Sequence, residues 1–323
     1  MYPLKFHPIL KSMLWGGEQI IPYKGIDIEQ SKVGESWEIS GVAGNESVVS
    51  QGPLAGKTIT ELLEEFGAQL VGKANYERFG NEFPLLIKFI DAKDDLSIQV
   101  HPDDKLAAER HNSKGKTEMW YVVDATADAK LRSGFSRQVS AQEYVAAVEN
   151  DTVTDILKEY NVAAGDLFFL PAGRIHSIGA GCFIAEIQQT SNITYRIYDF
   201  NRKDDQGNSR ELHTEQAKGA IDYTLLDDYR THYDRQAKDQ EVELVECPYF
   251  KTSLYDLAAA KTLDFTALDS FVIVICVEGS AAMVCDGVEM SIAQGESILI
   301  PATSGIVEIA PNGGCKLLTT SIE

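Results

Sequence analysis

Two short stretches decide the fold: GDLFFLPAGRIH at 165–176 and GESILIPATSGI at 295–306. In each stretch a glycine and an acidic residue predict a turn, an apolar run predicts a strand, and the following Pro-Ala ends strand pairing. A second β segment precedes each copy, at 118–131 and at 271–284. This internal repeat predicts two β-barrels of common ancestry.

The two copies differ at one position that matters for chemistry. His176 in the first copy aligns with Ile306 in the second. Imidazole is a metal ligand and an alkyl side chain is not. If both copies are barrels, only the first can hold a metal at this position. We therefore expect a mainly β protein, with a functional domain at 1–240 that carries inserted helices and a structural β domain at 241–323.

Charge and composition exclude several classes of protein. The chain has 323 residues, with 29 Lys and Arg against 49 Asp and Glu, for a formal net charge of −20. This charge argues against binding to nucleic acid or to an anionic membrane surface. Apolar runs of ~18 residues are absent, so no transmembrane helix is expected. The five cysteines lack CxxC spacing, which is typical of free thiols, and we expect a cytoplasmic protein.

The apolar periodicity predicts a few helices among the strands. The predicted helices are 57–73, 102–112, a helical pair at 140–160, and 211–220. PLLIKFIDA (84–92) and LSIQVHP (96–102) are predicted to be two strands around a turn. The charged, Tyr-rich stretch 220–242 is expected to be a linker, and the remainder of the chain is predicted to be almost all β.

A candidate metal site emerges from strand-like segments of the first half. Gln99 and His101 are two residues apart, so on a strand their side chains share one face. Glu118 opens the next strand, and His176 follows a Pro-Ala-Gly turn. This mixed nitrogen and oxygen set suits Zn²⁺ with one open position, while Fe²⁺, Co²⁺ and Mn²⁺ are alternatives. The other interpretation is that the two histidines are separate and partly buried.

Basic residues cluster along the same segments. In a chain of strongly negative charge, cations beside potential metal ligands indicate an anionic ligand. These residues are Lys88, Lys116, Arg174, Arg196 and Arg202, and Ser97 adds a hydroxyl on the face of Gln99. Ordinary surface polarity is the alternative explanation for any single one of them. A GxGxxG or Walker A loop is absent from the sequence, so a nucleotide cofactor has no support.

Several motifs together resemble a known family. They are LWGG (14–17), GESWEIS (34–40), PLLIKFIDAKDDLSIQVHPDD (84–104), GKTEMWY (115–121), LPAGRIHSIGAG (170–181) and TYRIYDFNR (194–202). In this order and spacing the chain resembles type I mannose-6-phosphate isomerase in its short bacterial form. The resemblance covers most of residues 1–215, and the remainder is similar to the C-terminal β domain of the family.

The resemblance implies a fold, a cofactor and a set of site residues. It implies two cupin-type jelly rolls, the second of them degenerate, and one zinc ion per chain. Carried over by motif, the metal ligands are His101, Glu118 and His176, and Gln99 matches a fourth ligand of longer members. Arg196 matches the active-site arginine, and Glu186 lies ten residues before it. Arg202 stands where longer members have a lysine, and the two residue types are not interchangeable at a bidentate site.

The implied reaction is the interconversion of mannose 6-phosphate and fructose 6-phosphate through an enediol. Glu186 is the first candidate for the base, and a hydroxide on the metal is the second. Burial is expected to raise the pKa of Glu186 toward neutrality, which suits a base. Arg196 is expected to hold charge on the enediolate, and Lys116 to hold phosphate or relay a proton. Lys88, Ser97 and Arg202 are the candidate substrate-binding residues.

Two other functions remain open at this stage. One is a metal-bearing cupin that binds a sugar phosphate without catalysis, and the other is an iron-dependent cupin dioxygenase. The expected partner in the preferred reading is a small sugar phosphate, with neither nucleic acid nor membrane involved. The sequence leaves monomer and homo-oligomer undecided.

Overall fold

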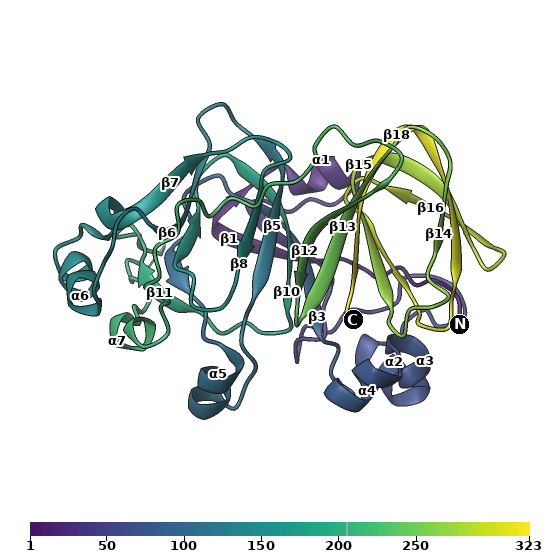
Figure 1. Ribbon diagram of the computed structural model, residues 1–323, viewed down its shortest axis with the longest axis horizontal. Coiled ribbons are helices and arrows are strands. Elements are labelled where there is room, and N and C mark those ends of the chain that lie inside the picture. The colour runs from purple at the N-terminus through teal and green to yellow at the C-terminus, as the bar shows by residue number, and fades with distance from the viewer. Residues whose placement is uncertain (205) are drawn as a thin grey trace.

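The computed structural model describes residues 1–204 and 206–323, which are mainly strands. Two jelly rolls lie side by side, with the termini near the lower edge of the second one (Figure 1). Two sheets build the first jelly roll, and strands β12 to β18 build the second. The expectation of a mainly β, two-part cupin fold with a few helices is confirmed.

The first jelly roll contains a six-stranded and a five-stranded sheet. The six-stranded sheet has the order β1 (Ile9–Gly17), β2 (Val33–Ile39), β3 (Leu85–Asp91), β10 (Cys182–Gln189), β5 (Glu118–Ala125) and β8 (Leu167–Leu170). The five-stranded sheet has the order β11 (Tyr195–Tyr198), β4 (Ile98–Val100), β9 (His176–Ile178), β6 (Lys130–Phe135) and β7 (Leu157–Asn161). Their antiparallel strands alternate inward and outward side chains, so the inward ones meet between the sheets.

The second jelly roll is a seven-stranded sheet. Its main path is β12 (Glu241–Cys247), β13 (Phe250–Leu257), β18 (Ile306–Ser321), β15 (Val272–Cys285) and β16 (Val288–Ala293). In addition, β14 (Lys261–Asp264) pairs with β18, and β17 (Ser297–Ile300) pairs with β15. The strands β15 and β18 are long, and each pairs with different neighbours along its length.

Short helices lie between these strands along the chain. They are α1 (Ile20–Lys24), α2 (Ile59–Phe66), α3 (Ala68–Val71), α4 (Lys73–Phe79), α5 (Asp104–His111), α6 (Ala141–Glu149) and α7 (Thr214–Lys218). Thr58 and Glu61 form a capping box at the start of α2, and Ser140 and Glu143 form another at the start of α6. Each box satisfies backbone N–H groups that have no partner within the helix. None of the helices in the described part of the chain is long and apolar enough to span a membrane.

Three sequence predictions need correction or refinement. The predicted helix at 57–73 is divided at Gly67 and Gly72, which have positive φ angles of 47° and 93°. The second helix of the pair predicted at 140–160 is wrong, because one 3₁₀ turn at Val153–Ile156 leads directly into β7. Pairing of β7 with β6 outweighs the helical spacing of the apolar residues there. The two strands around residues 92–95 exist, but β3 and β4 belong to different sheets.

The stretch predicted as a linker is anchored to the first jelly roll. Thr231 N–H donates to the carbonyl of Leu167 at 2.8 Å. The side chain of Tyr229 is buried in the core of that jelly roll. Residues 220–240 therefore form a strap that is held on the first jelly roll, partly by pairing with β8 at Arg230 and Thr231, before the second jelly roll begins at β12.

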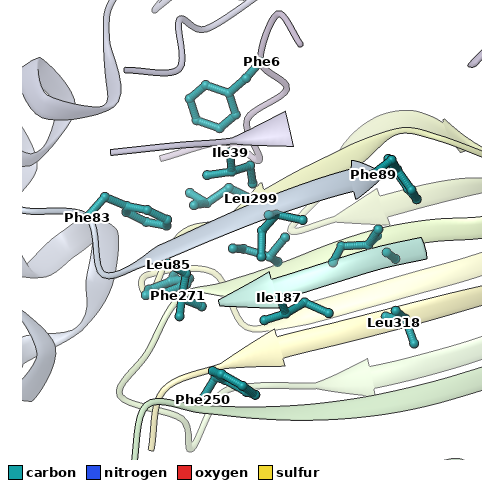
Figure 2. Close-up of a cluster of buried hydrophobic side chains, with 14 of the residues drawn as sticks. Phe6, Ile39, Phe83, Leu85, Phe89, Ile187, Phe250, Phe271, Leu299 and Leu318 are labelled. Carbon is teal, nitrogen blue, oxygen red and sulfur yellow. The ribbon is translucent and has the colours of Figure 1, made fainter. Parts of the chain in front are cut away.

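One hydrophobic core spans both jelly rolls. Its buried side chains include Phe89 and Ile187 from the first jelly roll and Phe250, Leu299 and Leu318 from the second. Figure 2 shows these side chains meeting between neighbouring sheets. Burial of this shared apolar surface is what fixes the two halves to each other.

Candidate functional site

Three predicted ligands lie together in the first jelly roll. His101 directly follows β4, Glu118 opens β5, and His176 opens β9. Their ligand atoms all lie within 4.8 Å of one another, and all three residues are buried. Glu118 Oε2 is 3.6 Å from His101 Nε2, and Glu118 Oε1 is 3.4 Å from His176 Nε2.

Strand register explains why segments far apart in sequence meet here. Gln99 of β4 pairs directly with His176 of β9, so the histidines come from neighbouring strands. Glu118 comes from β5 of the other sheet. The three ligands therefore face one another across the interior of the jelly roll.

Hydrogen bonds fix which ring nitrogen of each histidine faces the centre. His101 Nδ1 lies 2.9 Å from the carbonyl of Ile193, and His176 Nδ1 lies 2.8 Å from the carbonyl of Arg174. A carbonyl oxygen only accepts, so each Nδ1 carries the proton and each Nε2 presents a lone pair. A hydrogen bond from Nδ1 to a backbone carbonyl, with Nε2 left free for the metal, is typical of metal-ligating histidines.

Burial and local charge keep both imidazoles neutral. Burial, and then the Lys116 ammonium, lower the pKa of His101 well below its usual value. The same two causes lower the pKa of His176 to about 3. Neutral imidazole is the form that binds a divalent cation.

Glu118 completes a donor set that fits a divalent metal ion. Its Oε1 is buried and has no hydrogen-bond partner among residues 1–204 and 206–323. Burial raises the pKa of Glu118 to about 8, although the neighbouring Lys116 opposes this rise. A buried carboxylate with an unpaired oxygen beside two imidazole Nε2 atoms fits a metal site with two nitrogen ligands and one oxygen ligand.

Lys116 and Gln99 border this group of ligands. Lys116 Nζ lies 3.0 Å from His101 Nε2 and forms an ion pair with Glu118. Gln99 Nε2 lies 3.3 Å from His176 Nε2. Rotating this amide by 180° exchanges its nitrogen and oxygen, which would turn Oε1 toward the ligands.

A cavity of about 360 Å³ adjoins the ligand group. The sequence-predicted residues that line it are Lys88, Ser97, Gln99, Lys116, Glu186 and Arg196. All three tryptophans of the chain, Trp15, Trp37 and Trp120, also line it. The residues missed from the sequence include Lys11, Glu35 and Arg210. Glu35 lies in the GESWEIS motif, which could have pointed to it, whereas the local patterns around Lys11 and Arg210 carry no signal for this cavity.

The predicted base has the opposite pKa shift from the one expected. Trp120 Nε1 donates to Glu186 Oε1 at 2.9 Å, and Lys88 Nζ is 3.2 Å from Glu186 Oε2. Burial alone would raise the pKa of Glu186, but Lys116 and Lys88 outweigh it and lower the pKa to about 2. The expectation of a raised pKa is therefore wrong, because burial also brings two cations close.

Arg202, a predicted substrate-binding residue, lies outside the cavity lining, whereas Arg210, which was not predicted, is part of it. Arg202 donates to the carbonyl of Asp95 at 2.6 Å and to Asp199 at 3.0 Å, and it is not among the residues that line the cavity. Arg210 lines the cavity and pairs with the same Asp199. Asp199 is buried, so it holds both guanidinium groups in place.

Comparisons with known proteins agree with this geometry. The family model described as phosphomannose isomerase type I, catalytic domain, matches residues 4–124, and the mannose-6-phosphate isomerase cupin domain matches residues 240–321. A mannose-6-phosphate isomerase of Bacillus subtilis, ManA, is 32% identical over 315 residues, 97% of each chain. The chain belongs to the type I phosphomannose isomerases.

Other members of this family extend over nearly the whole chain. A mannose-6-phosphate isomerase of Streptococcus mutans is 33% identical and covers 93% of each chain. The crystal structure of mannose 6-phosphate isomerase from Bacillus subtilis superposes with a TM-score of 0.89, at 30% identity and with 99% of each chain covered. Type I phosphomannose isomerases interconvert mannose 6-phosphate and fructose 6-phosphate, which favours an isomerase over the dioxygenase considered from the sequence.

Proposed function

We propose that this chain interconverts mannose 6-phosphate and fructose 6-phosphate in the cavity beside His101, Glu118 and His176, with zinc bound by these residues and Gln99. The observation that carries the proposal is the convergence of three buried ligand atoms within 4.8 Å beside a cavity that contains cations. Two imidazoles and a carboxylate are a common ligand set for catalytic zinc. When bound, zinc supplies a Lewis acid that polarises the oxygens of the reacting carbons.

The isomerisation is a balanced transfer of protons. The C2–H bond of the aldose breaks and a C1–H bond forms, while the hydroxyl proton passes from O2 to O1. Glu186 is ionised at neutral pH because its pKa is about 2. It can therefore accept the proton, although it is a weaker base than a carboxylate of raised pKa, and Lys116 relays a proton between the oxygens. Arg196 compensates the negative charge of the enediolate.

Lys88 positions Glu186 in this scheme. Its Nζ lies between two carboxylates, 3.2 Å from Glu186 and 3.7 Å from Glu35. Burial would lower the pKa of Lys88, but these two carboxylates raise it overall. Because Lys88 already pairs with two carboxylates, it holds Glu186 in place and its positive charge is compensated. Lys88 therefore contributes little to phosphate binding.

Arg210 binds the substrate phosphate, next to Arg196, which faces the enediolate. Both line the cavity, and burial followed by the charge of Arg210 lowers the pKa of Arg196, so the two cations lie close together. Arginine presents N–H donors in a fork that matches phosphate oxygens. Ser97 adds a hydroxyl to the same wall, and Arg202 acts through Asp199 by keeping Arg210 in position.

The two jelly rolls have different proposed roles. We assign catalysis to residues 1–240 and a supporting β domain to residues 241–323, because every residue placed in the reaction lies before β12. A cytoplasmic location is part of the same proposal. It is supported by the five free cysteines, which suit a reducing compartment.

A matched pair of histidine variants tests the metal site. His101→Ala removes a buried ligand, whereas His232→Ala removes an exposed histidine that pairs only with Asp228. Zinc content is measured by elemental analysis and isomerisation by a coupled assay with mannose 6-phosphate. We expect His101→Ala to lose both and His232→Ala to keep both. Full activity of the chelator-treated protein, or a full zinc content in His101→Ala, would disprove the proposed site.

A further inference from the structure

The second jelly roll has a cavity in the place that corresponds to the catalytic one. In the first jelly roll Glu118 of β5 pairs with Leu170 of β8, and in the second Val272 of β15 pairs with Ile300 of β17. Leu170 and Ile300 occupy the same position of the sequence repeat. Val272 therefore stands where the first jelly roll has Glu118, and Val272 lines a cavity of about 510 Å³.

Two more catalytic positions can be matched through strand register. In the first jelly roll Glu186 pairs with the residue two after Glu118, and Lys88 pairs with Glu186. In the second, Thr319 pairs with the residue two after Val272, and Ser253 pairs with Thr319. Thr319 and Ser253 both line the second cavity. Carboxylate and ammonium groups are thus replaced by two hydroxyls at the corresponding positions.

The ionisable residues that line the second cavity are three acids and two lysines, namely Glu241, Asp264, Glu323, Lys251 and Lys261. Lys251 Nζ lies 3.4 Å from Glu323 and 4.0 Å from Glu243. Lys261 Nζ donates to the carbonyl of Asp239 at 3.0 Å. The metal-ligand group found within the described residues lies in the first jelly roll. Acidic residues outnumber lysines along this cavity, which disfavours a phosphate, so the cavity suits an uncharged ligand.

Hydroxyls and aromatic rings form its walls. Ser253, Tyr255, Thr319 and Ser321 are buried residues that line the cavity, and Phe265 adds an apolar surface. Small-molecule sites have volumes of about 300–1,000 Å³ and combine apolar walls with a few polar groups. A sugar ring matches such walls, because its hydroxyls exchange hydrogen bonds and its C–H face packs on an aromatic ring.

From this cavity we infer a second sugar-binding site, which takes a neutral hexose and works without metal or phosphate recognition. It is separate from the proposed catalytic site and does not depend on it. Thr319 hydrogen-bonds the sugar hydroxyls, and Tyr255 and Phe265 pack against the ring. Ser253 Oγ donates to Glu241 at 2.7 Å, so it accepts a hydrogen bond from the sugar.

Calorimetric titration of the zinc-loaded enzyme with D-mannose, D-fructose and D-glucose tests the inference. We expect at least one sugar to bind with a Kd on the order of 1 mM, corresponding to about −4 kcal/mol. The same affinity is expected in His101→Ala, which disables the catalytic site. Thr319→Val preserves the side-chain shape and should weaken binding about tenfold, the loss of one hydrogen bond in a desolvated site.

Three controls make the result decisive. Ser291→Ala changes an exposed hydroxyl of β16 outside the cavity and should leave affinity unchanged. Ser253→Ala removes the other hydroxyl assigned to the sugar and supplies a second cavity variant if Thr319→Val fails to fold. Both variants should leave kcat and KM for mannose 6-phosphate unchanged. The inference is overturned if none of the three sugars binds, if binding disappears in His101→Ala, or if a folded Thr319→Val or Ser253→Ala variant binds as well as the original enzyme.

Discussion

Replacing Arg210 with alanine should weaken the binding of mannose 6-phosphate without stopping the chemistry. Arg210 lines the cavity proposed to be catalytic, while its pairing with Asp199 leaves other N–H donors of the guanidinium for a ligand. A hydrogen bond to a charged group contributes about 1.5–3 kcal/mol. The side chain of Arg210 is 27% exposed, and water screens such a contact, so we expect the lower limit and about a tenfold rise in KM.

Arg202→Ala is the matched control for Arg210→Ala. Arg202 pairs with the same Asp199, but it points its Nη2 at Asp95 and is not a lining residue of the cavity. Both variants remove one partner of a buried carboxylate, so their losses in thermal stability should be similar. KM for Arg202→Ala should change by less than about threefold.

Steady-state kinetics with mannose 6-phosphate, together with the inhibition constant of inorganic phosphate, distinguish these outcomes. Loss of binding that is equal in the ground state and the transition state raises KM and leaves kcat in place. An unchanged KM in Arg210→Ala would refute the assignment. A larger effect of Arg202→Ala than of Arg210→Ala would show that Arg202 contacts the phosphate directly.

Two further predictions concern proton transfer and the core. Glu186→Gln should lower kcat. It should keep the acidic limb of the pH–rate profile between about pH 5 and 7, because a carboxyl with a pKa of about 2 is ionised over this whole range. Loss of that limb would contradict the assignment of an ionised Glu186 as the base. Its folded pKa lies below the usual 4.5, so the stability contributed by the Glu186 carboxylate is present above that value and is lost as the pH falls toward 2. Leu318→Ala, in the shared core, should lower the free energy of unfolding by about 2–5 kcal/mol in denaturant titrations. Leu226 is exposed, so Leu226→Ala should change the free energy of unfolding by under about 0.5 kcal/mol. An equal loss in Leu318→Ala and Leu226→Ala would show that packing in the shared core does not stabilise the fold.

Local sequence signals predicted the elements that depend on local chemistry. The helix at 102–112 is α5, because Asp103 caps its first turn and the pattern needs no distant partner. The stretch 157–161 was not predictable in the same way. Its apolar residues have helical spacing, and only the neighbouring β6 makes it a strand. Contacts between distant segments decide such cases.

The same distinction applies to the candidate site. Spacing along a strand places Gln99 and His101 on one face, but it cannot show which other strands that face meets. Arg210 enters the cavity from beyond the end of β11, so no periodicity connects it with Arg196. The pKa of Glu186 depends on Lys88, which lies in β3, and on Lys116, which lies just before β5. Family resemblance supplied what the spacing of residues could not.

The core that joins the two jelly rolls has a consequence for how this enzyme can change over generations. A protein truncated after the strap would expose Phe89, Ile187 and their apolar neighbours to solvent. Such a shortened protein would aggregate or be degraded. Selection for isomerisation therefore preserves the second half as a partner in folding, whatever else that half does. Such an obligate partner is free to acquire a task of its own, because its retention is already guaranteed.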